Sequence, residues 1–420
     1  MNKFVVLAIA LLVYPLSAQA QTTVGEEYQK ANEAYKVKEY SSFLTHIEKA
    51  NELRPNHRTI LYNLAVAYAL NQNFQSAIET LGYRASFYAM KDFSEDEDLK
   101  DLWEMEAYLT LLAHIDEKNT PIASSELQFE FSQPGFHPEG LAIHPETGNF
   151  LISDVRCGLI SSFTKEGANR KQILDLKEFG FWGAMGMKFD ANDSNVLWVT
   201  TSALPEFCNY SEELAGKSAL LKIDVAKRKL LKAYQLEGDH VFGDLTMDAS
   251  GEIYVSDSAS PSIYKLNRLN NQLEEFLSHE KWFNLQGLVI GTDNKMYVSD
   301  YIMGVYEVDL TTKLVKTVLD ENQLTRGTDG LYFTGNKLVL LQNGTQPFQV
   351  AEVSLAKTKS SSSIKALERA IPELNEPTLG AIHDDVLYFI SNSPWAFYKD
   401  GKPIIEQWPT LQIRKIALKK

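Results

Sequence analysis

The chain has 420 residues, 44% of them hydrophobic and 23% charged, which is typical of a globular protein long enough for more than one domain. Its 41 basic and 55 acidic residues give a formal charge of −14, which argues against nucleic acid and anionic membranes as partners, since both require clustered Lys and Arg. Two cysteines in the whole sequence exclude a disulfide scaffold and any Cys-rich zinc or iron–sulfur site.

Residues 1–20 have the pattern of a secretory signal peptide. Lys3 precedes an apolar run over residues 4–12, and Ala18 and Ala20 form an A-x-A cleavage site. The run is shorter than the roughly 20 residues of a spanning helix, and no cysteine follows the cleavage site to carry a lipid. We therefore expect a periplasmic or secreted protein that begins near Gln21 and keeps no stable membrane anchor.

Residues 24–116 are predicted to be helical, because apolar and small residues recur there at three- and four-residue spacing. A 34-residue repeat relates two halves of this segment, pairing Ala31 with Ala65, Ala34 with Tyr68, Phe43 with Ala77 and Ile47 with Leu81. The pattern resembles two tetratricopeptide units followed by a capping helix around residues 98–114, and an unrelated array of helical hairpins is the alternative. The resemblance implies a protein partner on a concave surface. The acidic run 94–98 is interpreted as a solvated turn at a helix N-terminus.

After a linker over residues 117–125, the hydrophobic period changes to two. Residues 126–420 contain six copies of a strand pair, four of them clear, and the second strands end at Asp154, Thr201, Asp257, Asp300, Asn343 and Asn392. These ends are 47, 56, 43, 43 and 49 residues apart, which suits one four-stranded blade per repeat. The predicted fold class is therefore α plus all-β, with helical hairpins followed by a six-bladed β-propeller. We expect residues 126–131 to complete the last blade and close the ring.

The repeated strand-end acids are interpreted as structural. A residue that most copies carry usually serves the repeat, here by bonding neighbouring turn backbone. Asn343 and Asn392 occupy the same position.

The motifs of this half resemble the regucalcin/gluconolactonase propellers, which are related to strictosidine-synthase-like and paraoxonase propellers. The resemblance rests on Glu139-Gly140-Leu141 before a Pro-x-Thr-Gly hairpin and on Gly-Leu pairs before Tyr-Val-Ser-Asp strands, and it covers about residues 131–418. It implies a divalent metal, usually calcium, on the propeller axis. The positions that match the metal ligands of this family are Glu139, Gln286 and Asp329.

Two positions depart from the family pattern: Gln286 replaces an Asn, and Gly243 stands where a further Asn often lines the pocket, with Asp244 adjacent. Two carboxylates and an amide are oxygen ligands that suit Ca²⁺ or Mg²⁺. Such an ion polarises a carbonyl or lowers the pKa of bound water, and Asp329 is the candidate general base. The alternative is that these acids only bond exposed backbone N–H groups in the channel.

Further candidates surround this site. His240 and His137 precede inner strands and are candidate bases, although histidines in such positions are more often turn or surface residues. Arg326 either binds a substrate carboxylate or pairs with Asp329. Asp244 and Asn343 are assigned to the pocket, and Glu376 is another acid before an inner strand.

Cys157 and Cys208 both follow second strands of adjacent repeats, on the side of the channel mouth. In an oxidising compartment we expect them to form a disulfide. A Cys nucleophile is not expected, because no His lies in an evident partner position. The sequence also lacks a Walker loop, a Rossmann fingerprint, a Gly-x-Ser-x-Gly elbow and a His-Glu-x-x-His motif.

Two functions remain open from the sequence. The first is a metal-dependent hydrolase for a small lactone or ester. The second is a non-catalytic extracytoplasmic binding or scaffold protein that uses the helical and propeller surfaces, a view favoured by the apolar Met185 and by Gly243 at inner-strand starts. Propellers host both classes.

Overall fold

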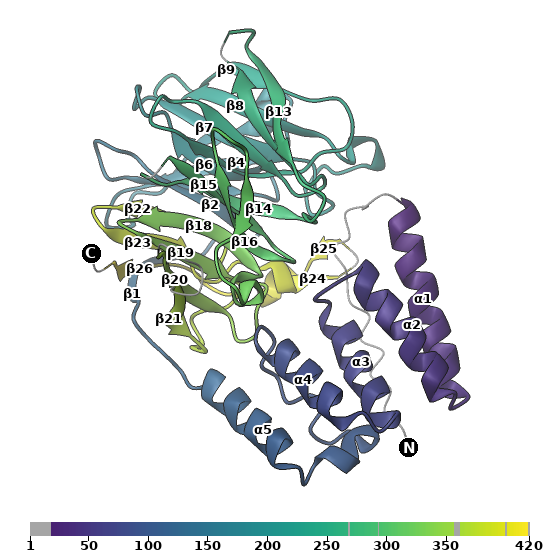
Figure 1. Cartoon of the computed structure of the whole chain (residues 1–420). Helices are drawn as coiled ribbons and strands as arrows, with labels where there is room; N and C mark the ends of the chain where they lie inside the picture. Colours follow the sequence, from purple (N-terminus) through teal and green to yellow (C-terminus); the bar gives the residue numbers. More distant parts are fainter. Residues whose placement is uncertain (1–17, 268, 293, 357–361, 400, 419–420) are drawn as a thin grey trace.

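The computed structural model describes residues 18–267, 269–292, 294–356, 362–399 and 401–418. The first helix begins at Ala18, so the predicted signal peptide lies almost entirely outside the described residues. The helices pack together on one side of the propeller (Figure 1), and the predicted α plus all-β architecture is confirmed.

Two helical hairpins form the N-terminal segment. They are α1 (Ala18–Lys36) with α2 (Tyr40–Leu53), and α3 (Arg58–Leu70) with α4 (Phe74–Ala85). The second helices begin 34 residues apart, and the repeat alanines Ala31, Ala65 and Ala77 are fully buried, which lets the helix backbones approach closely. The hairpin array is thus observed, whereas its assignment to the tetratricopeptide family stays an expectation.

The predicted capping helix is divided into two elements, a 3₁₀ helix η1 (Glu97–Leu102) and α5 (Glu106–Lys118). The acidic run before it is less solvated than expected. The Tyr62 hydroxyl donates to Asp96, and the Tyr35 hydroxyl donates to Asp98 at 2.5 Å. These two carboxylates therefore join the capping elements to α1 and α3.

Six antiparallel four-stranded sheets form the propeller, each running from an inner to an outer strand. In chain order the first five are β2 (Pro138–Ile143), β3 (Phe150–Asp154), β4 (Leu159–Phe163) and β5 (Lys171–Asp175); β6 (Gly183–Phe189), β7 (Val196–Ser202), β8 (Ser218–Asp224) and β9 (Lys229–Tyr234); β10 (Phe242–Met247), β11 (Ile253–Asp257), β12 (Ser262–Asn267) and β13 (Gln272–Ser278); β14 (Leu285–Ile290), β15 (Lys295–Asp300), β16 (Gly304–Asp309) and β17 (Val315–Thr317); β18 (Thr328–Thr334), β19 (Lys337–Gln342), β20 (Gln349–Ser354) and β21 (Ser363–Arg369).

The sixth blade contains both ends of the propeller sequence. It consists of β22 (Gly380–His383), β23 (Val386–Ile390), β26 (Leu411–Ala417) and, at its outer edge, β1 (Glu126–Phe131). The predicted ring closure is therefore confirmed. Phe129 of β1 stacks on Phe163 of the first blade with ring centroids 5.3 Å apart, so the closing strand also contributes to the core between the two blades.

The strand-end acids have the structural role expected of them. Asp154 accepts the backbone N–H of His137 at 3.0 Å, and Asp257 accepts that of Val241 at 3.0 Å. Asp300 accepts the N–H of Ile302 at 2.8 Å. In each case a buried carboxylate ties the end of a second strand to nearby turn backbone.

Candidate active site at the propeller axis

The inner strands begin with a register shift that turns their first residues toward the axis. The shift lies between Pro138 and Leu141 in β2, and equivalent shifts occur in β6, β10, β14 and β18. A bulge of this kind re-aims a side chain. The glycine in the motif allows neighbouring inner strands to approach: a Cβ at Gly140 would lie 2.2 Å from the Met185 carbonyl oxygen.

Glu139 lies at the centre of an acidic cluster. Its side chain is 6% exposed, and the Trp395 indole N–H donates to its Oε2 at 2.9 Å. Burial raises the pKa of Glu139 well above its ordinary value, and the negative charges of Asp329, Glu376 and Asp244 raise it further. The structure thus places three acids that the sequence analysis assigned to the site, Glu139, Asp329 and Asp244, within range of one another's charge. Glu376 joins them, although the sequence analysis noted it only as another acid before an inner strand.

Asp329 is held by a short relay of hydrogen bonds. The Asn343 amide donates to its Oδ2 at 2.7 Å, and the Tyr301 hydroxyl donates to the Asn343 amide oxygen at 2.9 Å. Burial raises the pKa of Asp329 to about 7 against the lowering effect of Asn343. Asn343 therefore contacts the candidate ligand Asp329, whereas Asn392, at the equivalent strand end, accepts the backbone N–H of Gln412 in β26.

Glu376 is the acid that sequence reasoning undervalued. Its backbone has φ +64°, a left-handed conformation that is uncommon for a non-glycine residue and that clusters at functional sites. Burial raises the pKa of its carboxyl to about 8, with the Asp329 charge as the second cause. The signal in the sequence was an acid directly before Pro377 at the start of an inner strand.

The two departures from the family pattern compensate each other. Gln286 donates from its amide nitrogen to Asn284 Oδ1 at 2.7 Å, and a Cβ at Gly243 would lie 3.2 Å from Gln286 Oε1. The longer arm of Gln286 therefore extends into space that a side chain at position 243 would occupy.

Asp244 faces a cavity toward the other end of the channel. Its Oδ1 accepts the N–H of Leu245 at 2.8 Å, and burial raises its pKa to about 6 against the attraction of Lys188. Lys188, Asp244 and Tyr332 line a cavity of about 740 Å³. The channel therefore has acidic groups near the inner-strand starts, and the cavity beyond them is lined by both acidic and basic side chains.

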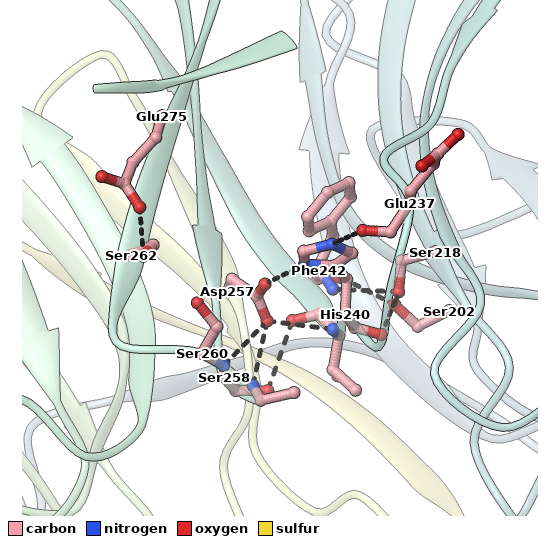
Figure 2. A network of polar contacts seen from close by, with 12 residues as sticks. Ser202, Ser218, Glu237, His240, Phe242, Asp257, Ser258, Ser260, Ser262 and Glu275 are labelled. Carbon is pink, nitrogen blue, oxygen red and sulfur yellow. Dashed lines mark hydrogen bonds and ion pairs between the residues drawn. The ribbon is translucent and has the colours of Figure 1, made fainter. Parts of the chain in front are cut away.

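His240 is engaged on both ring nitrogens. Nδ1 lies 2.7 Å from Asp257 Oδ2 and Nε2 lies 3.0 Å from the Glu237 carbonyl oxygen, as the network in Figure 2 shows. The Asp257 hydrogen bond is the main cause of a raised His240 pKa. This histidine therefore fixes a loop to a strand end, and neither nitrogen is available as a base in this arrangement.

His137 is fully buried in an aromatic surrounding. Its Nδ1 lies 2.7 Å from the Tyr398 hydroxyl, and its ring packs edge-on against Trp395 at a centroid distance of 4.4 Å. Burial lowers its pKa to about 3, so it stays neutral. Its position supports Trp395, which in turn donates to Glu139.

Arg326 does not pair with Asp329. It is 8% exposed, and its guanidinium lies 3.8 Å from the ring centroid of Phe87, in the segment that follows α4. The pairing alternative is therefore not formed, and the arginine instead lies at the contact between the helical segment and the propeller.

Cys157 and Cys208 are free thiols in the structure, so the expected disulfide is not formed here. The two side chains are close enough to hydrogen-bond, and together with burial this raises the pKa of Cys157 to about 12. The predicted proximity is observed, and the bridge itself remains a prediction for the exported chain.

The donor types at the axis suit a hard cation. Among the described residues no group of three or more His, Cys, Asp and Glu side chains is spaced to hold a metal, but Glu139, Asp329 and the Gln286 amide oxygen supply two carboxylates and one neutral oxygen. The two carboxylates repel each other in a buried channel, and a bound cation would relieve that repulsion.

No helix in the described part of the chain combines the length and apolarity needed to cross a membrane.

No protein-family model and no curated protein matches the sequence. Solved structures do match. The Malassezia sympodialis allergen Mala s 1 has a TM-score of 0.52 at 14% identity, covering 69% of this chain and 95% of its own. The gluconolactonase XC5397 of Xanthomonas campestris has a TM-score of 0.49 at 14% identity, covering 71% of this chain and 91% of its own. At this identity the likeness to Mala s 1 concerns the fold alone.

Proposed function

We propose that the chain is an exported hydrolase that depends on a divalent metal, calcium in the first instance, and acts on a small lactone or ester at the propeller axis. The observation that carries the proposal is the cluster of Glu139, Asp329 and Glu376, buried or partly buried carboxyl groups whose pKa values are all raised, first by burial and, for Glu139 and Glu376, also by the charge of Asp329. Perturbed acids gathered in a channel are typical of catalytic or cation-binding sites.

Glu139, Gln286 and Asp329 are the residues that would hold the ion, and a bound cation would polarise the carbonyl oxygen of the substrate. Asp329 is the candidate to accept a proton from the attacking water, and a cation bound beside it would favour its charged, proton-accepting form. Asn343 and Tyr301 orient its carboxylate, and Trp395 excludes water from one oxygen of Glu139.

The export part of the proposal rests on the signal pattern of residues 1–20 alone. A small substrate whose reacting lactone or ester group is uncharged is consistent with the acidic groups at the axis, and a protein partner would use the concave side of the helical hairpins.

A non-catalytic binding or scaffold role is the second candidate. The observation that favours it is the hydrogen bond from Trp395 to Glu139, which satisfies one carboxylate oxygen that a cation would otherwise use. Met185, buried and apolar at an inner-strand start, points the same way.

A calcium titration and a lactone panel on purified full-length protein separate the two. Glu139→Gln and Asp329→Asn are near-isosteric, and each should lower calcium-dependent hydrolysis by at least about 100-fold, the usual contribution of a positioned acid or base. Glu280→Gln removes an exposed carboxylate and should leave the rate unchanged. Absence of both calcium binding and hydrolysis in the wild type would support the scaffold role.

A further inference from the structure

A second cavity lies where the helical segment contacts the propeller. Its volume is about 250 Å³. It is lined by residues 54–57 between α2 and α3, by Arg58 at the start of α3, by Tyr88, and from the propeller by Tyr301, Arg326 and Asn343 among others. The cavity walls are bonded together across the two domains. Asn56 donates to the Ile302 carbonyl at 2.9 Å, and Gln346 pairs with the backbone of Phe87 at 2.9 Å.

This interdomain pocket contains an uncompensated positive cluster. Arg54, Arg58 and Arg326 all line it, and among the described residues no acidic side chain forms an ion pair with any of them. The three charges and burial together lower the pKa of His57 to about 4. Cations are seldom buried without a partner. Arg326 is the buried one of the three, and the charge of Asp300 acts on it only from beyond ion-pair distance, so the pocket favours a further negative charge.

Arg326 is the innermost of these cations. More than nine tenths of its surface is buried, and one face of its guanidinium stacks on Phe87. The only hydrogen bond of this guanidinium to a described residue is a long one, 3.4 Å from Nε to the Ile302 carbonyl. Its two terminal nitrogens remain unpartnered in a wall of the pocket. A planar guanidinium held in this way presents a fork that matches a carboxylate or phosphate.

The start of α3 adds to the attraction for an anion. His57 is the N-cap residue of this 13-residue helix, and no side chain caps it. The N–H groups of the first turn are therefore unsatisfied by a capping side chain, at the positive end of the helix dipole. Since His57 and Arg58 also line the pocket, two independent features favour negative charge at the same place.

We propose that the interdomain pocket binds an oxyanion, a carboxylate or phosphate group of a small ligand, through Arg326, Arg58 and the first turn of α3. Tyr301 and Asn343 line this pocket and also form the relay to Asp329. A ligand bound here would therefore lie next to the axis site. The inference that this ligand is the substrate of the axis site rests on the proposed function. The helical segment would then supply substrate recognition to the propeller.

The test is isothermal titration calorimetry of the full-length protein with inorganic phosphate and, separately, with gluconate, in buffer freed of divalent cations. Arg58→Gln should weaken binding at least tenfold. Arg326→Lys keeps the charge over Phe87 but loses the fork, and should also weaken binding at least tenfold while the protein keeps its unfolding temperature. Arg228→Gln, at an exposed arginine, is the matched control and should bind as the wild type does.

Binding of either probe with this mutational pattern supports the proposal, and the tighter probe identifies the oxyanion. No binding by the wild type at millimolar concentration, or equal binding by all three variants, would overturn it. Because neither metal nor hydrolysis enters the titration, the outcome is separate from that of the proposed function. If the protein binds the oxyanion but hydrolyses no lactone, the proposed pocket is supported and the proposed hydrolase function is refuted.

Discussion

Replacement of Glu376 by Gln is expected to stabilise the protein at neutral and alkaline pH. Burial and the Asp329 charge raise the pKa of Glu376 from 4.5 to about 8, and no hydrogen bond from the described residues reaches its carboxylate. At pH values between these two pKa values, the folded chain therefore keeps a proton on Glu376 that the unfolded chain has released. Stability then falls as pH rises through this window.

The size of the effect follows from the shift. At about 1.4 kcal/mol per pKa unit, a full shift from 4.5 to about 8 corresponds to about 5 kcal/mol against the charged form above pH 8. The same linkage gives about 3 kcal/mol at pH 7 and almost nothing below pH 4.5. Glu376→Gln cannot ionise, so its gain over the wild type should increase with pH by these amounts, as upper bounds because the side chain is partly exposed to the channel.

Urea denaturation at pH 5, 7 and 8.5, without divalent cations, measures this gain. Glu280→Gln removes an exposed carboxylate and should stay within about 0.5 kcal/mol of the wild type at every pH. Parallel pH profiles for the wild type and Glu376→Gln, or a variant less stable than the wild type at pH 8.5, would refute the reasoning, because either result means that the carboxylate has a stabilising partner.

Three further outcomes are expected. Gly243→Asn should displace the Gln286 amide oxygen and weaken calcium binding about tenfold, with recovery in the double variant that also carries Gln286→Asn; calorimetry that finds no coupling would contradict this compensation. Phe129→Ala should lower the free energy of unfolding by about 3–5 kcal/mol, and a loss below 1 kcal/mol in urea denaturation would mean that β1 contributes little to ring closure. Thiol titration of native exported protein should detect no free thiol at Cys157 or Cys208, and two reactive thiols would exclude the predicted bridge.

The propeller was predictable because its strands are local and repeated. Each blade repeats the same alternation, so weak signals reinforce one another, and the leftover strand 126–131 fits only the open edge of the last blade. The capping segment lacked this redundancy. Its division into η1 and α5 depends on hydrogen bonds from Tyr35 and Tyr62, which come from helices far away in sequence.

The first residues of the inner strands were predictable for the same reason, since the motif fixes their register. Their partners were not. Trp395 and Tyr301 come from loops of other blades, and the contact of Arg326 with Phe87 depends on how the helical segment sits on the propeller. No periodicity in the sequence encodes that arrangement.

The structure separates two kinds of buried acid that look alike in the sequence. Asp154 and Asp300 have pKa values raised to about 6, yet each accepts several backbone N–H groups, so their burial is compensated and serves the repeat. Glu376 occurs once and has no such donors. An uncompensated, largely buried carboxyl costs a large part of a stability of about 5–15 kcal/mol, because no donor offsets the loss of its hydration. Such a cost without a packing benefit is typical of groups at functional sites, so the position of Glu376 beside Asp329 supports the role proposed for this cluster at the axis.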